Sequence, residues 1–225
     1  MNYHLKITLF ALTFLFAAGI NSPIYPADTP VALPGETYPV NLSIAEALEI
    51  IHTEPGLKQI GNTEATVVVT EFTDFRCFFC QRYANEIFPT LFKEYIWPGK
   101  ILYQFKHFPV TGSEAFEIAA EGECAGEQNL FWQFKHRTMT RMLENQDKNI
   151  SSLLDAVKEE LEIPDEEKFV TCIDSEETER TVQEDLETGR EKNLRSTPSV
   201  LINDEEVIGL YPIGVYRGII EYYLE

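Results

Sequence analysis

The chain has little positive charge. Its 225 residues include 18 lysines and arginines against 37 aspartates and glutamates, which gives a formal net charge of −19 at pH 7. Nucleic acids are bound by basic surfaces, so this balance makes a nucleic acid an improbable partner. The sequence also has no internal repeat, and the roughly 185 residues after Pro39 are enough for one domain with an elaboration and a sizeable core.

Cysteine is scarce, and the four cysteines do not form a zinc motif. Two of them make the motif Cys77-Phe78-Phe79-Cys80, but no second CxxC and no close Cys/His pair could complete a metal site. Half of a zinc site therefore stays only a minor alternative for this motif. We expect no metal and no other cofactor.

The apolar run at the N-terminus is too short to cross a membrane easily. From Ile7 to Ile20 it would extend about 21 Å as a helix, less than the roughly 30 Å hydrocarbon core of a bilayer. Lys6 precedes it, and small and polar residues follow, which is typical of a secretory signal peptide within residues 1–27. Cleavage after Gly19 is one option, and an uncleaved anchor is the alternative. We expect a periplasmic or otherwise extracytoplasmic protein.

The CxxC motif stands where a strand meets a helix. The strand-like run Thr66–Phe72 precedes it, and a long helical pattern begins at Cys77. Unpaired N–H groups and the helix dipole favour a thiolate at a helix N-terminus, and only the thiolate attacks disulfides. We therefore predict a redox dithiol in which Cys77 is the nucleophile and Cys80 the resolving thiol. A purely structural disulfide is the alternative.

The dithiol lies in a predicted βαβ unit. The helix from Cys77 to Ile96 has apolar residues at three- and four-residue spacing, and Pro89 should kink it. The strand Ile101–Phe108 follows and should run parallel to Thr66–Phe72, because a helix lies between them. We thus expect an α/β fold.

A helical region separates this unit from the last strands. The aromatic residues Phe131, Trp132 and Phe134 should form the core of that region. Strand signals return at Ser199–Ile202 and at Val207–Gly209, and Gly214–Tyr222 should form a closing helix. The expected helices between them are 113–128, 130–143, 151–161, 165–172 and 176–192.

These motifs, in this order, resemble the DsbA-like thiol:disulfide oxidoreductases. The resemblance runs from about Gly56 to Leu224. It is carried by four stretches: Glu71-Phe72-Thr73-Asp74-Phe75 before the CxxC motif, Phe88-Pro89-Thr90-Leu91 in the helix, Phe131-Trp132, and Ser196-Thr197-Pro198-Ser199-Val200-Leu201-Ile202-Asn203. It implies a thioredoxin-like fold with an inserted α-helical subdomain.

The resemblance also implies a domain plan and a substrate site. Residues 28–55 would form an N-terminal extension, 56–112 and 194–225 the two parts of the thioredoxin-like domain, and 113–193 the helical insertion. It implies a cis bond at Pro198 that faces the cysteines, with the backbone of Thr197 receiving the substrate chain. Phe78 and Phe79, next to the nucleophile, are further candidates for substrate contact.

Two charged residues gain a candidate role from the same plan. Glu71 lies on the strand that leads to the dithiol, and Lys106 lies on the strand expected beside it. A carboxyl group buried beneath the dithiol favours its protonated form and could relay a proton to or from Cys80, with Lys106 tuning it. Alternatively, Glu71 is an ordinary exposed strand residue.

The second cysteine pair is predicted to form a structural disulfide. The CxxC motif accounts for two of an even number of cysteines in an oxidising compartment, which leaves Cys124 and Cys172 for each other. Some members of the family that the chain resembles have such a pair at similar positions. The alternative is two buried free thiols that pack as small apolar groups.

The sequence departs from the strongest oxidants of the family, which usually have proline and histidine between the cysteines. Phe78 and Phe79 remove that stabilising histidine, so the dithiol should be less oxidising. We still expect a dithiol oxidase that passes disulfides to folding exported proteins. The family resemblance implies that a membrane quinone-linked thiol oxidase recharges it. The alternatives are a reductase or isomerase, and a redox-inert chaperone module. The N-terminal region is too short for the isomerases' dimerisation domain, so we expect a monomer.

Overall fold

The computed structural model of the protein describes residues 37–51, 53–144 and 149–225. The expected signal peptide, and the first part of the expected N-terminal extension, lie outside the described residues. Among the described residues, no helix has both the length and the apolar character needed to span a membrane.

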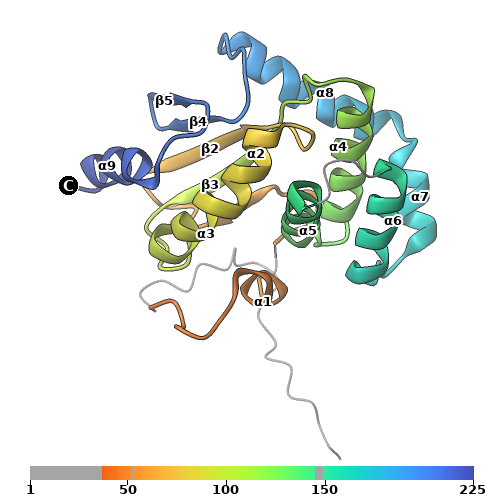
Figure 1. The fold of residues 1–225 in the computed structure, drawn as a ribbon, viewed down its shortest axis with the longest axis horizontal. Helices are drawn as coiled ribbons and strands as arrows, with labels where there is room; N and C mark the ends of the chain where they lie inside the picture. Colours follow the sequence, from red (N-terminus) through yellow and green to blue (C-terminus); the bar gives the residue numbers. More distant parts are fainter. Residues whose placement is uncertain (1–36, 52, 145–148) are drawn as a thin grey trace, which may run out of the picture.

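A five-stranded mixed sheet lies at the centre of this described part (Figure 1). One pair of neighbouring strands is parallel, and its two strands are connected by a helical crossover, as parallel pairing needs. The other three pairs are antiparallel. In spatial order the strands are β1 (Gln59–Gly61), β3 (Leu102–His107), β2 (Val68–Thr73), β4 (Ser199–Ile202) and β5 (Glu205–Ile208).

One nearly continuous helical run connects β2 to β3. It consists of α2 (Phe78–Arg82), the π-helix η1 (Tyr83–Ile87), α3 (Phe88–Leu91) and a second π-helix, η2 (Phe92–Ile96). Proline lacks an N–H and disrupts the regular α-helical ladder. The first π turn comes just before Pro89, and within it the Phe88 N–H donates to the Tyr83 carbonyl. The expected irregularity at Pro89 therefore takes the form of a π segment, a rare geometry that occurs mostly as single turns within α-helices.

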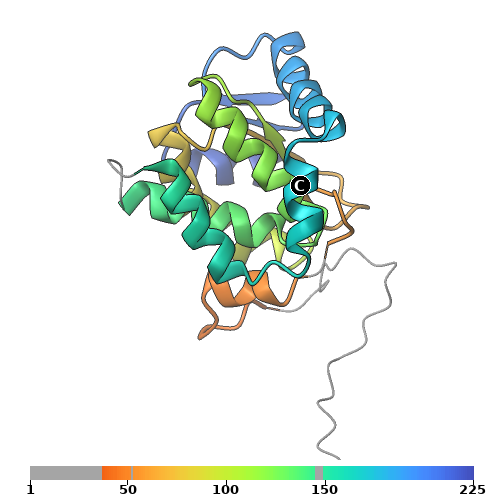
Figure 2. The same cartoon turned by 90° about the vertical axis from the view of Figure 1, so that its right-hand side faces the viewer.

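Five helices separate β3 from β4 in the described chain and gather at one end of the sheet (Figures 1 and 2). After β5, α9 (Ile213–Leu224) packs at the opposite end of the sheet (Figure 1). The five are α4 (Ser113–Gly126), α5 (Phe131–Glu144), α6 (Ile150–Leu161), α7 (Glu166–Ile173) and α8 (Glu176–Glu191).

The two faces of the sheet are covered by different helices. Side chains alternate along a strand, so Glu71 and Phe105, which are register partners, share one face, while Phe72 and Lys106 share the other. The helical run, α5 and α9 cover the first face. On the second face, Phe72 packs with Leu186 of α8.

The aromatic residues of α5 belong to the core of the sheet as well as to the insertion. Phe131 packs on Phe105 of β3 with ring centroids 4.8 Å apart, and Trp132 stacks on Phe88 at 5.9 Å. The sequence pattern predicts a separate helical core for these aromatic residues. They instead join the insertion to the sheet in one continuous core, because α5 lies across the helical run.

Helix α8 approaches the sheet closely at a glycine. A Cβ atom on Gly189 would lie 2.6 Å from the ring of Phe108 and 3.2 Å from that of Phe72. Contacts of real Cβ atoms are longer than this, so only glycine at position 189 allows α8 to lie so close to the sheet. The absence of a side chain at Gly189 therefore sets the distance between α8 and the sheet.

Two elements were not predicted from the sequence. Helix α1 (Ile44–Glu49) begins at a capping box in which Ser43 and Glu46 bond each other's backbone N–H groups. It packs on the core through Ala47 and Leu48, and Gln133 of α5 donates to the Leu48 carbonyl at 2.9 Å. The short strand β1 adds an antiparallel edge to β3. The described part of the N-terminal extension is thus an ordered component of the fold.

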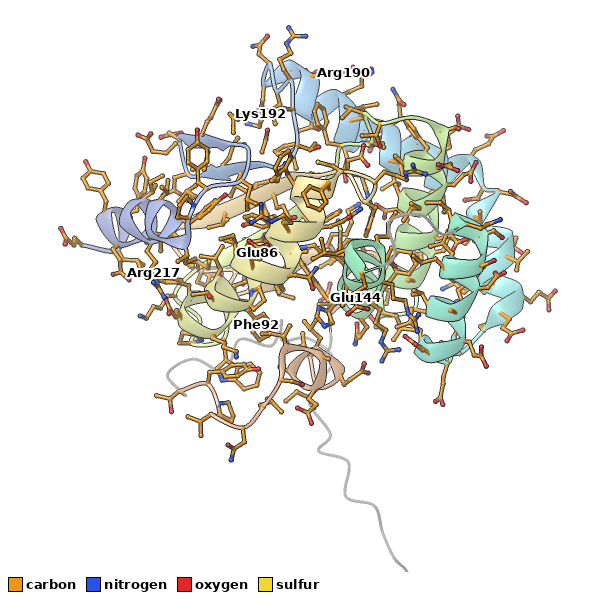
Figure 3. The ribbon with its side chains drawn as sticks, in the orientation of Figure 1. Glu86, Phe92, Glu144, Arg190, Lys192 and Arg217 are labelled. Atoms are coloured by element: carbon orange, nitrogen blue, oxygen red, sulfur yellow. A yellow bond between two sulfur atoms is a disulfide. The ribbon has the colours of Figure 1, made fainter. Side chains whose placement is uncertain are left out.

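The end of the helical run connects this extension with α9. Phe92 packs edge-to-face on Tyr38, with ring centroids 6.0 Å apart, on the side of the molecule that carries α1 (Figure 3). Arg217 of α9, also labelled in Figure 3, forms an ion pair with Glu94. Both ends of the described chain therefore brace the helix that begins at the dithiol.

Candidate redox site

Cys77 is the N-cap residue of α2, at the end of the turn that follows β2. The turn is held by Asp74, whose backbone carbonyl accepts from the Cys77 N–H at 3.1 Å. The Asp74 carboxylate accepts from the N–H groups of Arg76, Val110 and Thr111, each at 2.8 Å. One buried carboxylate thus fixes both the turn before the dithiol and the loop after β3.

The sulfur of Cys77 is partly exposed and surrounded by hydrogen-bond donors. The Cys80 thiol donates to it, and the backbone N–H groups of Phe79 and Cys80 point toward it, as expected at the start of a helix. The side chain of Thr197 adds a further hydrogen bond. Partial burial raises the pKa of Cys77, but these hydrogen bonds outweigh it and lower the pKa to about 6. A large fraction of Cys77 is therefore thiolate at neutral pH.

Cys80 is fully buried, one turn further along α2. Burial raises the pKa of its thiol well above the ordinary value, and the neighbouring Cys77 raises it further. The polar groups of Thr73 and of the Asp74 backbone oppose this rise in pKa in part. Both cysteines have free thiols in this structure. The pair thus combines an accessible thiolate with a protected thiol.

The loop before β4 faces the dithiol. The Thr197–Pro198 peptide bond is cis, as the family resemblance implies. The carbonyl oxygen of Thr197 lies 3.3 Å from the Cys77 sulfur. This contact arises because β4 pairs with β2 in a register that places Ser199 opposite Phe72.

Phe78 and Phe79 are exposed next to the nucleophile. Their side chains are 44% and 52% exposed, and their rings meet edge-to-face at 5.6 Å. Val110, in the loop tied to Asp74, is also exposed. An accessible thiolate, a buried partner thiol, an opposing backbone carbonyl and apolar side chains form a site suited to dithiol–disulfide exchange with a peptide chain.

Residues 53–221 match the family described as Thioredoxin. The chain belongs to this family. Within it, the chain is a DsbA-like thiol:disulfide oxidoreductase with a thioredoxin-like fold. It is 31% identical over 150 residues to the probable disulfide bond formation protein D of Bacillus anthracis, over 65% of this chain and 69% of that protein. It is 24% identical to disulfide bond formation protein D of Bacillus subtilis, over 71% and 74% of the two chains.

Solved structures of the DsbA-like group share the fold. Alpha-DsbA1 of Wolbachia pipientis has a TM-score of 0.66 at 20% identity and covers 79% of this chain and 95% of its own. Oxidised BdbD of Bacillus subtilis has a TM-score of 0.66 at 22% identity and covers 77% and 97%. At these identities the likeness concerns the fold.

Glu71 of this thioredoxin-family protein is completely buried behind the dithiol, not exposed. One carboxylate oxygen accepts from the Thr73 hydroxyl at 2.8 Å. The other accepts from the Tyr103 hydroxyl at 2.7 Å and from the Lys135 ammonium at 2.5 Å. Each oxygen therefore has at least one partner, as a buried carboxylate requires.

The structure corrects the expected role of Lys106. Its ammonium lies 2.6 Å from Asp185 of α8, on the face of the sheet opposite Glu71. Residues adjacent in sequence point to opposite faces, and Lys106 follows Phe105, the register partner of Glu71. The cation beside Glu71 is instead Lys135, from α5 of the insertion. Lys135 was missed because its sequence context is that of an ordinary helical lysine.

The second cysteine pair is oxidised, as predicted. A disulfide joins Cys124 of α4 to Cys172 of α7, with Cα atoms 5.7 Å apart. The Thr178 hydroxyl of α8 lies 3.8 Å from the Cys124 sulfur and 3.3 Å from the Cys172 sulfur. The disulfide thus joins two helices of the insertion and packs against a third, with Cys124 fully buried.

Proposed function

We propose that the protein works outside the cytoplasm and donates disulfides to folding exported proteins through a mixed disulfide on Cys77. The observation that carries this proposal is the sulfur of Cys77, a partly exposed group at a helix N-terminus, 3.3 Å from the Thr197 carbonyl. The backbone of Thr197, in the loop before β4, would receive an extended substrate chain beside the nucleophile. Pro198, Phe78 and Phe79 would supply apolar contacts.

The donor reaction proceeds in two exchanges. A substrate thiolate attacks the Cys77 sulfur of the Cys77–Cys80 disulfide, which forms the mixed disulfide and releases Cys80 as a thiolate. A second substrate thiolate then attacks the substrate sulfur of the mixed disulfide, which forms the substrate disulfide and releases the Cys77 thiolate. Two electrons pass from the substrate to the protein. The lowered pKa of Cys77 favours this direction, because a stable thiolate is a good leaving group.

Proton transfer completes the chemistry. Cys80 must take up a proton when it is released and lose one when it attacks a mixed disulfide. Glu71, buried beneath the dithiol, is the proposed acid and base for this thiol. A membrane quinone-linked thiol oxidase would return the dithiol to the disulfide state. The Cys124–Cys172 disulfide supports an oxidising compartment.

The test is turnover on a reduced, unfolded protein that needs disulfides. The oxidised wild-type protein should form substrate disulfides stoichiometrically, detected by mass shifts after thiol alkylation, and Cys77→Ser should form none. Given the same substrate in its disulfide-bonded form, reduced Cys80→Ser should accumulate a mixed disulfide on Cys77, because no Cys80 thiol is present to resolve it. A wild-type protein that only reduces substrate disulfides would be a reductase or isomerase. Suppression of aggregation that persists in Cys77→Ser, without disulfide formation, would indicate a chaperone.

The compartment needs a separate test. A membrane-impermeant thiol reagent added to intact cells should label Cys77 of the reduced protein, and it should not label a cytoplasmic protein with an exposed cysteine. Absence of labelling on Cys77 in intact cells, with full labelling after lysis, would contradict an extracytoplasmic location.

A further inference from the structure

Two cations next to the loop that faces the nucleophile have no partner. Lys192 and Arg195 are exposed, and within the described residues neither side chain has an ion pair, a hydrogen bond or an aromatic ring beside it. Every other described lysine and arginine has an ion-pair partner or lies over an aromatic ring. Acids are abundant in a chain with a net charge of −19, so position, and not a shortage of acids, leaves these two side chains unpaired.

The end of α8 fixes where the loop begins. Asn193 follows the helix and has a left-handed backbone conformation, with a φ of 60°. Its N–H donates to the Arg190 carbonyl at 2.8 Å, and the Leu194 N–H donates to the Gly189 carbonyl at 3.0 Å. These two hydrogen bonds form the Schellman motif that closes many helices. The chain therefore leaves α8 in one defined direction.

The loop is also anchored on both sides of Arg195. Leu194 is buried and belongs to the small apolar cluster that contains Phe72 of β2. Beyond Arg195, the Ser199 hydroxyl donates to the Ser196 carbonyl at 2.6 Å. Arg195 therefore extends from an ordered backbone, and little backbone entropy would be lost when it binds a partner.

Arg195 lies close to the nucleophile. It is two residues before Thr197, whose carbonyl oxygen is 3.3 Å from the Cys77 sulfur. Two residues of extended chain span at most about 7 Å, so the backbone of Arg195 lies within that distance of the backbone of Thr197. Lys192 is the last residue before the loop, at the end of α8, where Figure 3 labels it. A substrate chain that lies along Thr197 would therefore have an unpaired cation beside it.

Positive charge gathers at this loop although the whole chain is acidic. Residues 190–198 contain three cations, Arg190, Lys192 and Arg195, and one acid, Glu191. Arg190 forms an ion pair within α8, which leaves the other two cations to set the charge of the loop. The edge of the site next to Thr197 therefore has a local positive potential that is opposite to the charge of the molecule.

We propose that Arg195, with Lys192 behind it, binds an acidic side chain of the substrate, so that the protein prefers exported chains with Asp or Glu two or three residues from the reacting cysteine. An extended chain advances about 3.3 Å per residue, so a side chain at that separation comes level with Arg195. The inference rests on the proposed function and names a specificity-determining residue for it. The net charge of −19 alone favours the opposite preference, because it repels acidic chains.

The test uses synthetic peptides with two cysteines, which the oxidised protein converts to their disulfide form. The peptides differ in one residue, Glu, Gln or Lys, placed two positions before a cysteine in one set and two positions after it in another. A neighbouring charge also changes the reactivity of the cysteine itself. Each rate constant is therefore divided by that of the same peptide with a small neutral disulfide, 2-hydroxyethyl disulfide.

The wild-type protein should oxidise the peptides of at least one set in the order Glu, Gln, Lys. The Glu peptide should exceed the Gln peptide by roughly 2- to 5-fold in the normalised rate constant, as an exposed ion pair allows. The difference should disappear in about 1 M salt, where charges are screened beyond roughly 3 Å.

Substitutions locate the effect. Arg195→Gln should remove most of the preference for Glu, and Arg195→Glu should reverse it in favour of Lys. Lys192→Gln should have a smaller effect. Arg180→Gln is the matched control, because it removes the same charge from an exposed position in the first part of α8, where Arg180 pairs with Glu184. Its peptide preference should equal that of the wild type.

The outcomes separate this inference from the proposed function. A wild-type protein that oxidises none of the peptides would contradict the proposed function itself. Normal oxidation with equal normalised rates for Glu and Gln in both sets, or with a preference for Lys, would overturn the role of Arg195 alone. An equal loss of preference in Arg180→Gln and Arg195→Gln would also overturn it, since the overall charge of the protein would then explain the effect.

Discussion

The thioredoxin-like part and the helical insertion each contain one cysteine pair, and the two pairs are built for opposite purposes. Cys77 and Cys80 lie within one turn of helix at the end of a strand, and one of them reaches the surface. Cys124 and Cys172 are 48 residues apart and join two helices, with Cys124 fully buried and Cys172 half-buried. The comparison shows that access and local hydrogen bonding, more than the presence of two thiols, decide which pair can react.

The largest expected difference between the pairs is in activity. Cys77→Ser should abolish disulfide transfer, because no other described thiol combines exposure with a lowered pKa. Cys124→Ala/Cys172→Ala should keep a transfer rate close to that of the wild type. The measurement is disulfide formation in a reduced, unfolded substrate. Loss of activity in the double alanine variant at a temperature where it is folded would show that the second pair takes part in exchange.

The next difference is in stability. Opening a loop of this length should lower the free energy of unfolding of Cys124→Ala/Cys172→Ala by up to about 4 kcal/mol on the chain-entropy model. Chemical denaturation of the oxidised proteins would measure it. Cys77→Ala/Cys80→Ala is the control and should lose much less, because its loop is very short. Equal losses in the two double variants would contradict the structural assignment of the second disulfide.

A third prediction tests how the insertion docks on the sheet. Gly189→Ala should destabilise the protein by about 1 to 3 kcal/mol, because its Cβ atom would overlap the ring of Phe108. Gly218→Ala is the matched control in α9, where an added Cβ atom meets nothing within 4 Å. That change should be neutral or stabilise by up to about 1 kcal/mol through helix propensity. Thermal unfolding would decide, and equal shifts in both variants would contradict the close approach of α8.

The smallest effect concerns pH. With the pKa of Cys77 at about 6, its alkylation rate should rise roughly tenfold from pH 5 to pH 8 and level off above neutrality. This pKa lies below that of an unfolded thiol, about 8.5, so the Cys77 thiolate stabilises the folded state. That stabilisation is complete above pH 8.5 and is lost as the pH falls through 6. The free energy of unfolding of the reduced protein should therefore increase, relative to that of Cys77→Ser, as the pH rises from 6 to 8.5. An alkylation rate that still climbs steeply at pH 8 would contradict the lowered pKa.

Periodicity and motif order predicted most of the fold. The strands β2, β3 and β4, the helices of the insertion and the closing helix lie close to their expected positions. Helix α1 was missed because its apolar pattern spans only six residues, although its Ser43–Glu46 capping box is visible in the sequence. Strand β1 has three residues, too few for an alternating pattern.

The positions of site residues were predictable where they depend on local sequence. They were not predictable where they depend on how distant helices pack on the sheet. The position of Cys77 at a helix N-terminus follows from the strand-to-helix pattern around it. The partner of Glu71 could not be found in this way, because Lys135 is 64 residues away and reaches the carboxylate only through the packing of α5 on the sheet. Strand alternation alone, once the register is known, excludes Lys106.

The contact between Cys77 and Thr197 has a consequence for the order in which the chain is made. The two residues are 120 positions apart. A chain that emerges from its N-terminus presents Cys77, Cys80 and Cys124 before Cys172 and long before the loop that faces the nucleophile. The earliest disulfide available to the growing chain is the short-range one between Cys77 and Cys80, which keeps both thiols away from Cys124. The loop at Thr197, the proposed wall of the substrate site, is thus made last, after all four cysteines.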